Sequence, residues 1–308
     1  IDQIFDISDT STYYANGFAD ETGKKITSKS IVEIPSEHVI QSQWIPKAHA
    51  IFTDVSDNWA NKGISICKYY GYMSGVSETE FGSENPVTRA QVTVLYRMEG
   101  SPSAGNNDFY DVPTYSGTDT DKPTETSNAV SWADKNSIAS GVNTTIRKFE
   151  PEGELSRQQM VRMLYGLASF RNSASIHAAK YNDDSVVNLN LIPGGSSVSD
   201  SYKTAMRWAY DQKIISGKSG GNLAPADSVT RAEYATFIMR LKNLFDREDE
   251  QKVLRTYQVD DQIYTISVYP QQTYTLISDI PVRDSGIFIG WESGGRLYGA
   301  GETIDEPN

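Results

Sequence analysis

The chain has 308 residues, of which 38% are hydrophobic and 22% are charged, and its net charge is −12. This composition predicts a folded protein of two or three domains and argues against nucleic-acid binding, which needs a concentrated basic surface. The single cysteine, Cys67, excludes an intrachain disulfide and a thiolate metal cage, and no apolar run reaches the roughly 18 residues of a membrane-spanning helix.

Residues 1–50 contain two short segments with a β-type pattern, 31–35 and 38–40, preceded by Gly- and Asp-containing turns. No specific motif occurs in this region. We expect an irregular or β-containing segment that is either the end of a preceding module or a cap on the domain that follows.

The main feature of the sequence is a phrase that occurs three times: Ser or Thr, then an arginine, then Gln or Glu two residues later. The arginines are Arg89, Arg157 and Arg231. Upstream of each lies a Ser-Gly pair, whose glycines are Gly75, Gly141 and Gly217. Each repeat opens with an aromatic residue two positions before an aspartate, and these aspartates are Asp54, Asp111 and Asp183. The same order of features predicts three repeats, at about 51–102, 108–172 and 180–246.

Each phrase predicts the start of a helix, at Thr88, Ser156 and Thr230. Ser or Thr followed three residues later by Gln or Glu is a capping box. The third, sixth and seventh residues after each arginine are apolar or aromatic, which is typical of a helix that buries one face. An upstream helix should end near each Ser-Gly pair. Because one such unit is too small to bury its own apolar faces, we expect the three to pack around a shared centre.

These repeats resemble the S-layer homology (SLH) domains of bacterial surface proteins. The family pattern is present in Phe52-Thr-Asp54-Val55, Trp59-Ala60, Phe149-Glu-Pro151 and Thr230-Arg-Ala-Glu233. The resemblance covers 51–246 and implies a mainly α fold with three helix-loop-helix repeats in a pseudo-threefold bundle. It also implies an extracellular location at the bacterial cell wall or S-layer, and grooves that bind a secondary cell-wall polysaccharide, often one with pyruvate ketals.

The chain departs from the family pattern at several positions. Ser83 replaces a usual proline, the second and third repeats lack an equivalent of Trp59, and polar loops are inserted at about 112–127 and 185–200. Two of the three box positions are Gln rather than Glu, which preserves the cap but removes a negative charge. We therefore do not expect the three grooves to bind equally.

The arginines are the main candidates for ligand contacts. Each occupies a first helical position, where the helix dipole disfavours a cation by up to about 1 kcal/mol, yet a guanidinium there can bind a carboxylate in bidentate fashion. The alternative is an internal ion pair with one of the repeat aspartates, and the two roles can coexist. If the arginines are ligand contacts, Arg89→Ala should leave thermal stability nearly unchanged.

The candidate ligand-binding residues are grouped by repeat. They are Asp54, Trp59, Gly75 and Arg89 in the first, Asp111, Gly141 and Arg157 in the second, and Asp183, Gly217 and Arg231 in the third. The first repeat is the strongest candidate because it alone combines an aspartate with Trp59, a possible stacking platform for a sugar ring.

Residues 247–308 predict a small β-rich module. From Val253 to Ile304, alternating and β-branched residues are separated by turn-forming pairs, which indicates strands and hairpins. Residues 288–304 resemble the short β-grasp repeats of bacterial surface proteins, which implies a spacer or a contact to another protein. The alternative is a strand-rich tail packed on the bundle.

No catalytic pattern stands out, and we expect no catalytic residue, metal or cofactor. The three histidines, His38, His49 and His177, lack metal-ligand spacing. The leading hypothesis is a non-catalytic module that anchors a protein to an anionic cell-wall polysaccharide. A protein–protein adaptor or surface-layer assembly subunit, with other surface proteins as partners, is the alternative. A carbohydrate-active enzyme fragment is the third, because glycoside hydrolysis needs only two carboxylates.

Overall fold

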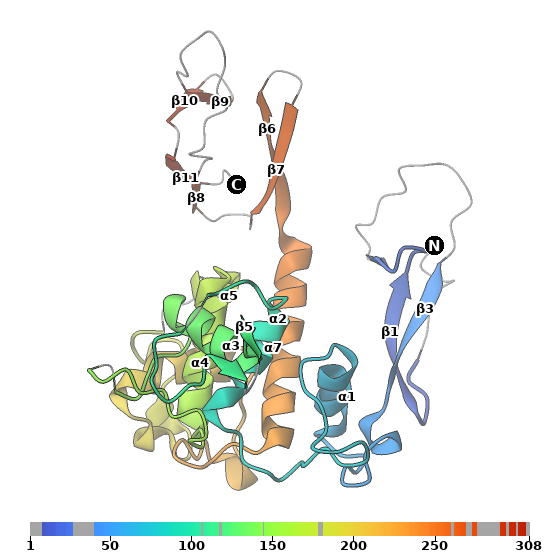
Figure 1. Cartoon of the computed structure of the whole chain (residues 1–308). Coiled ribbons are helices and arrows are strands. Elements are labelled where there is room, and N and C mark those ends of the chain that lie inside the picture. Colours follow the sequence, from blue (N-terminus) through green and yellow to red (C-terminus); the bar gives the residue numbers. More distant parts are fainter. Residues whose placement is uncertain are drawn as a thin grey trace. The chain divides into compact units, whose positions relative to one another are not determined.

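The computed structural model describes residues 8–26, 40–105, 107–116, 119–143, 145–177, 181–259, 262–268, 273–275, 290–293, 296–299 and 301–305. It divides into two compact units, Ile1–Leu244 and Phe245–Asn308 (Figure 1). The described residues are mainly helical, with small antiparallel sheets, which confirms the predicted fold class.

The N-terminal segment contains a three-stranded antiparallel sheet of order β2-β1-β3. Its strands are β1 (Tyr13–Ala19), β2 (Lys25–Ile26) and β3 (Gln41–Pro46). Tyr14 of β1 and Ile45 of β3 face each other in the register and form an apolar cluster with Ile66, against which Met239 packs. The predicted β segment at 31–35 and most of that at 38–40 lie outside the described residues.

The repeat region is built from helices joined by loops. The first repeat contains α1 (Asn61–Tyr69), the 3-10 turn η2 (Arg89–Gln91) and α2 (Val92–Met98). The second contains β4 (Tyr115–Ser116), β5 (Asp119–Pro123), α3 (Glu125–Lys135), α4 (Arg157–Phe170) and α5 (Ala174–His177). The third contains α6 (Lys203–Asp211) and the long α7 (Arg231–Gln251), with short 3-10 turns before and between them.

A closed ring of backbone hydrogen bonds joins the three segments that precede α2, α4 and α7. Val87 N–H donates to Val229 O (2.8 Å), Val229 N–H to Leu155 O (3.0 Å), and Leu155 N–H to Val87 O (2.9 Å). All three side chains are fully buried. The ring satisfies polar groups that would otherwise be stranded in the core. It also places the starts of the three helical phrases in equivalent positions around one centre.

The predicted capping boxes form in the second and third repeats. Ser156 N–H donates to Gln159 Oε1 (2.9 Å) while Gln159 N–H donates to Ser156 Oγ (3.4 Å), and Thr230 and Glu233 exchange the same two bonds at 3.2 Å. They satisfy free N–H groups in the first turn.

In the first repeat the predicted capping box is wrong. The Thr88 side chain makes no capping hydrogen bond, because a 3-10 turn intervenes and Gln91 N–H bonds to the Thr88 carbonyl instead (3.0 Å). The α-helix consequently begins only at Val92. Gln91 Oε1, which would have completed the box, is buried and has no hydrogen-bond partner among the described residues.

The described part of the second unit consists mostly of strands, as predicted. Strand β6 (Val253–Val259) pairs with β7 (Gln262–Val268), β8 (Thr273–Thr275) with β11 (Thr303–Asp305), and β9 (Trp291–Ser293) with β10 (Arg296–Tyr298), all antiparallel. Parts of the segment that resembles a β-grasp repeat, including 288–289 and 294–295, lie outside the described residues.

The two kinds of helix start lead to a testable difference in stability. Ser156→Ala should lower the free energy of unfolding by about 1 kcal/mol, because the Ser156 hydroxyl caps α4. Thr88→Ala is the matched control and should cost less, since the Thr88 side chain caps nothing. Urea denaturation of both variants measures the difference; an equal loss at both positions would contradict this account of the first repeat.

Candidate functional site

Each repeat arginine extends into the next repeat, in cyclic order. Arg89 donates through Nε to Phe149 O (2.6 Å) and through Nη2 to Ser140 O (2.6 Å). Both acceptors are in the second repeat: Phe149 lies before the helix phrase, and Ser140 is the serine of the Ser-Gly pair. The guanidinium also lies over the Phe149 ring, 4.5 Å from its centroid, which adds a cation–π contact.

The same contacts recur in the other two repeats. Arg157 donates through Nε to Leu223 O (2.9 Å) and through Nη2 to Ser216 O (2.8 Å). Arg231 donates through Nε to Phe81 O (3.0 Å) and through Nη2 to Ser74 O (2.5 Å), which closes the cycle on the first repeat. Each arginine therefore lies at a junction between successive repeats, where the family resemblance predicts a groove.

The aspartates bind backbone N–H groups. Asp54 accepts from the N–H groups of Phe81 (2.7 Å), Gly82 (2.8 Å) and Ser83 (3.0 Å). Asp111 likewise accepts from the N–H groups of Phe149 and Glu150. The proposed ion pairs between these two aspartates and the arginines are therefore not formed. Asp183 departs from the pattern, since it accepts from the nearby Ser185 N–H (2.9 Å).

The pKa of Asp54 reflects these contacts. Desolvation raises the pKa of the carboxyl group, but the three backbone N–H groups outweigh this effect and hold the pKa below its usual value. The pKa of Asp111 is lowered in the same way, by Phe149 and Glu150 N–H against a desolvation that raises it. Both aspartates thus stabilise the loop of their own repeat as carboxylates.

The Ser-Gly glycines are required by close packing. A Cβ at Gly75 would lie 2.4 Å from Ser77 O and 2.8 Å from the Phe52 ring, and one at Gly141 would lie 2.6 Å from Lys148 O. At Gly217 the nearest atom, a backbone carbon of Gly221, would be at 2.0 Å. No residue larger than glycine fits these turns without movement of the backbone.

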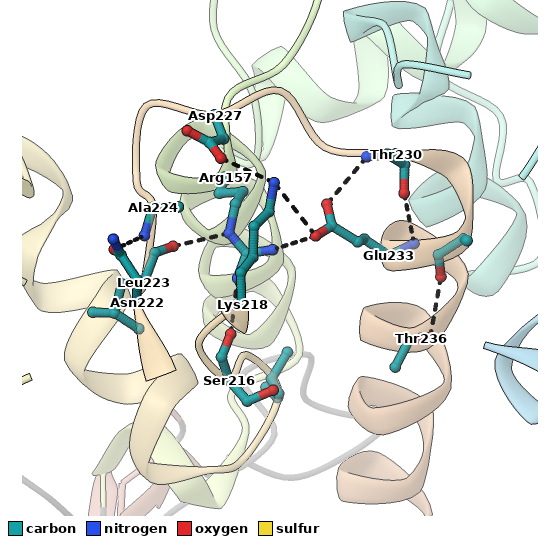
Figure 2. Close-up of polar contacts among 12 residues, drawn as sticks. Arg157, Ser216, Lys218, Asn222, Leu223, Ala224, Asp227, Thr230, Glu233 and Thr236 are labelled. Atoms are coloured by element: carbon teal, nitrogen blue, oxygen red, sulfur yellow. Dashed lines mark hydrogen bonds and ion pairs between the residues drawn. The ribbon is translucent and has the colours of Figure 1, made fainter. Parts of the chain in front are cut away.

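The groove at Arg157 is filled by charged side chains of the chain itself (Figure 2). The Arg157 side chain is 2% exposed, and its remaining amino group, Nη1, donates to Glu233 Oε1 at 3.0 Å. Lys218 Nζ lies 3.0 Å from Asp227 Oδ2 and 3.7 Å from Glu233 Oε1. Burial lowers the pKa of Arg157, and the charges of Glu233 and Asp227 oppose this effect. The positive charges of Arg157 and Lys218 are thus balanced by the negative charges of Asp227 and Glu233.

The groove at Arg231 is different, because it contains a cavity of about 210 Å³. Its lining residues are Met73, Ser74, Gly75, Gln91, Thr93, Val94, Arg97 and Arg231. Arg231 has no carboxylate within ion-pair distance among the described residues, and its Nη1 makes no hydrogen bond there. The Gly75 N–H is also without a hydrogen bond to any described residue. The cavity is thus lined by two residues with unpartnered donors, while Gln91 Oε1 is itself buried and has no partner among the described residues.

Arg97 adds positive charge at the edge of this cavity. It forms an ion pair with Glu125 through Nε (2.6 Å) and Nη2 (2.5 Å), and its Nη1 donates to Tyr72 O (3.0 Å). The Glu125 contact is bidentate, so Arg97 is held in place. Its charge is largely neutralised, and Arg231 is the main cation available to an anion.

Grouping the site residues by sequence repeat assigned the wrong arginine to the first groove. Gly75 lies in the same cavity as Arg231 of the third repeat, whereas Arg89 crosses to Ser140 in the second. Trp59 is 61% exposed, as a stacking platform would be, but it does not line this cavity. Gln91, which lines the cavity, is not among the predicted site residues, although the sequence shows glutamine there in place of the usual glutamate.

The buried arginine contacts correct the expectation that the arginines are dispensable for stability. Arg157→Ala should lower the free energy of unfolding by about 3–5 kcal/mol, because it strands two carbonyls and removes the nearest cation from Glu233. Arg89→Ala should also lower it, since Arg89 is only 7% exposed. Arg162→Ala, an exposed position on α4, is the matched control. Chemical denaturation that gave equal values for Arg157→Ala and Arg162→Ala would refute this role.

The lowered pKa of Asp54 predicts a pH-dependent effect of its removal. Because the folded-state pKa lies below the unfolded value of about 3.9, the carboxylate stabilises the fold above that value, and this contribution is lost as pH falls through the folded pKa. Asp54→Asn should therefore be destabilising at pH 7 and less destabilising at pH 3, where part of the carboxylate contribution is already lost. Denaturation at both pH values, with the exposed Glu78→Gln as control, measures this.

Among the described residues, no helix is both long and apolar enough to cross a membrane. No group of three His, Cys, Asp or Glu side chains is placed to hold a metal ion in the described ranges.

Comparison with known proteins relates the first and third repeats to a family. The S-layer homology domain model matches residues 51–93 and 195–235. The chain is 27% identical over 203 residues to exoglucanase XynX of Acetivibrio thermocellus, a match that covers 63% of this chain and 16% of that protein. It is 26% identical over 198 residues to amylopullulanase of Thermoanaerobacterium thermosulfurigenes, covering 62% of this chain and 9% of that protein.

The chain thus spans less than a fifth of the length of these two relatives. Its two matched segments contain the Ser-Gly pairs and the arginine phrases of the first and third repeats. Residues 51–93 and 195–235 thus match the S-layer homology domain, and this match indicates association with the cell wall or S-layer.

Proposed function

We propose that this chain is a non-catalytic anchoring module whose groove at Arg231 binds an anionic secondary cell-wall polysaccharide. The observation that carries this proposal is the cavity between the third and first repeats, where Arg231 Nη1 and the Gly75 N–H have no partner among the described residues. A carboxylate on a sugar, such as a pyruvate ketal or a uronic acid, supplies the acceptor oxygens that both groups lack.

The chemistry of the cavity supports a sugar acid over a simple anion. A carboxylate accepts from the guanidinium and the backbone N–H, and charge-assisted hydrogen bonds of this kind are about twice as strong as neutral ones. Ser74, Gln91 and Thr93 line the cavity beside the apolar Met73 and Val94, and this mixture of polar and apolar groups suits a sugar ring. A volume of about 210 Å³ is small for a ligand site and suits one residue of a polymer.

Because the net charge is −12, binding of an anionic polysaccharide requires a local positively charged site. An acidic protein repels a polyanion at long range, so a positive pocket must supply the attraction at contact. Arg231, with Arg97 at the edge, provides it. Trp59, exposed on the first repeat, is proposed to stack on a neighbouring sugar of the same chain.

The middle segment is proposed to be a third repeat of the same kind, with domain limits of 1–50, 51–246 and 247–308. Arg89 and Arg157 make the same pair of carbonyl contacts as Arg231, and Leu155 is a member of the backbone ring. The β-rich C-terminal module is proposed to act as a spacer or a contact to another surface protein. Because the two relatives are far longer than this chain, we propose that it corresponds to an anchoring part of a larger protein.

A substitution that fills the cavity tests this function and leaves the arginine contacts, which stabilise the fold, in place. The purified chain should sediment with protein-free cell-wall sacculi and lose this retention after the secondary polysaccharide is extracted. Thr93→Phe places a ring in the cavity and should weaken retention about tenfold or more, whereas Arg162→Phe, an exposed position on α4, should not. Circular dichroism checks that both variants are folded.

The outcomes separate the candidate functions. Absence of retention by intact sacculi would point to a protein–protein adaptor. Retention that survives Thr93→Phe but not Trp59→Ala would move the binding surface away from the Arg231 groove.

A further inference from the structure

We infer that Gln91 and Glu233, the last residues of the helix-start phrases at Thr88 and Thr230, decide whether the groove beside each accepts an anionic sugar. Glu233 is a built-in carboxylate that occupies the groove at Arg157, whereas Gln91 leaves the groove at Arg231 available. This inference rests on the proposed function and adds to it a residue that determines which groove binds.

The geometry of the two grooves carries the comparison. Arg157 and Arg231 use the same two atoms, Nε and Nη2, to hold carbonyls of the next repeat, so Nη1 is the remaining amino group in both. At Arg157 the remaining group donates to Glu233 at 3.0 Å. Cyclic order places Gln91 in the corresponding position for Arg231, and Gln91 does line the cavity there.

The charge of the side chain makes the difference. The Glu233 carboxylate accepts a hydrogen bond from Arg157 and balances its charge (Figure 2). The Arg157 side chain is 2% exposed. A ligand carboxylate would have to displace Glu233 and leave two like charges close together, which is unfavourable in a partly buried site. The neutral amide of Gln91 neither pairs with Arg231 nor repels an anion.

Gln91 also lowers the stability of the free protein. A residue with a purely structural role would not be expected to do so, whereas a residue that favours binding can. Its Oε1 is buried without a partner among the described residues, and Thr88 lacks the cap that a box would provide. Buried unsatisfied acceptors destabilise a fold. A glutamate at this position would pair with Arg231, so the residue that favours binding is the one less favourable for stability.

The first test replaces the neutral amide by a carboxylate. Gln91→Glu in the full chain should leave the melting temperature unchanged or higher while it weakens binding to a methyl glucoside 4,6-pyruvate ketal about ten- to a hundredfold. Gln41→Glu, an exposed position on β3, carries the same change in net charge and should bind as the wild type does. Titration calorimetry measures both. Undiminished affinity in Gln91→Glu would overturn the inference.

The second test removes the built-in carboxylate and supplies one from solution. Glu233→Ala should lower the melting temperature, and sodium acetate should restore it in a saturable manner, because acetate enters the space beside Arg157. Acetamide, with sodium chloride to match ionic strength, should not restore it. Glu233→Gln, which keeps the side-chain volume, should not respond to acetate. No difference between acetate and acetamide in Glu233→Ala would also overturn the inference.

The two tests separate this inference from the proposed function. Acetate rescue of Glu233→Ala without retention of the wild type by sacculi would support the built-in carboxylate and reject polysaccharide anchoring. Retention of the wild type by sacculi together with full ketal binding by Gln91→Glu would support anchoring and reject the selective role of Gln91.

Discussion

The arrangement of the whole repeat region depends on hydrogen bonds from one guanidinium to two backbone carbonyls, made three times. Each arginine joins the start of its own helix to the Ser-Gly turn of the next repeat, while the ring through Val87, Leu155 and Val229 joins the same segments at the core. Because a buried carbonyl without a donor is costly, these contacts fix how far apart successive repeats lie. The grooves between repeats, and the chemistry available in them, are consequences of that spacing.

The arginines thus serve packing in all three repeats, and we propose that Arg231 serves recognition as well. Two of its donors, Nε and Nη2, are committed to the fold in all three repeats, and only the third is available for another partner. What surrounds that donor differs between the grooves: a carboxylate beside Arg157, and a cavity beside Arg231. The three segments share the same arginine–carbonyl contacts, but the side chains around Arg157 and Arg231 differ in charge.

The fold was largely predictable from the sequence, because capping boxes and apolar stripes are local signals. The phrases at Ser156 and Thr230 predicted both helix start and capping geometry. The upstream helices end before the Ser-Gly pairs, and the left-handed residues that follow them are Gly71, Ser137 and Lys213. The exception, Thr88, shows the limit: whether an N–H bonds to a side chain or to a carbonyl three residues back depends on small differences in backbone dihedrals that the phrase does not encode.

The site was less predictable, because its residues come from repeats far apart in the sequence. The sequence identified Arg231 and Gly75 as candidates but paired each with its own repeat. The aspartates illustrate a second limit: a carboxylate and an arginine in one pattern suggest an ion pair, yet Asp54 and Asp111 bind backbone N–H groups. Only the three-dimensional arrangement shows which donors are already satisfied.

The cyclic order of the contacts has a consequence for how the chain acquires its groove. Arg231 binds carbonyls at sequence separations of 150 and 157 residues, whereas Arg89 bonds to carbonyls only 60 and 51 residues away. Closing such a long loop is slow and entropically expensive, so this contact is expected to form late. A ribosome must therefore have synthesised α7 before the first repeat can have a complete groove. A chain interrupted anywhere before Arg231 would fold at most two linked repeats and would lack the cation at this groove, so attachment at this site would report that the repeat region is complete.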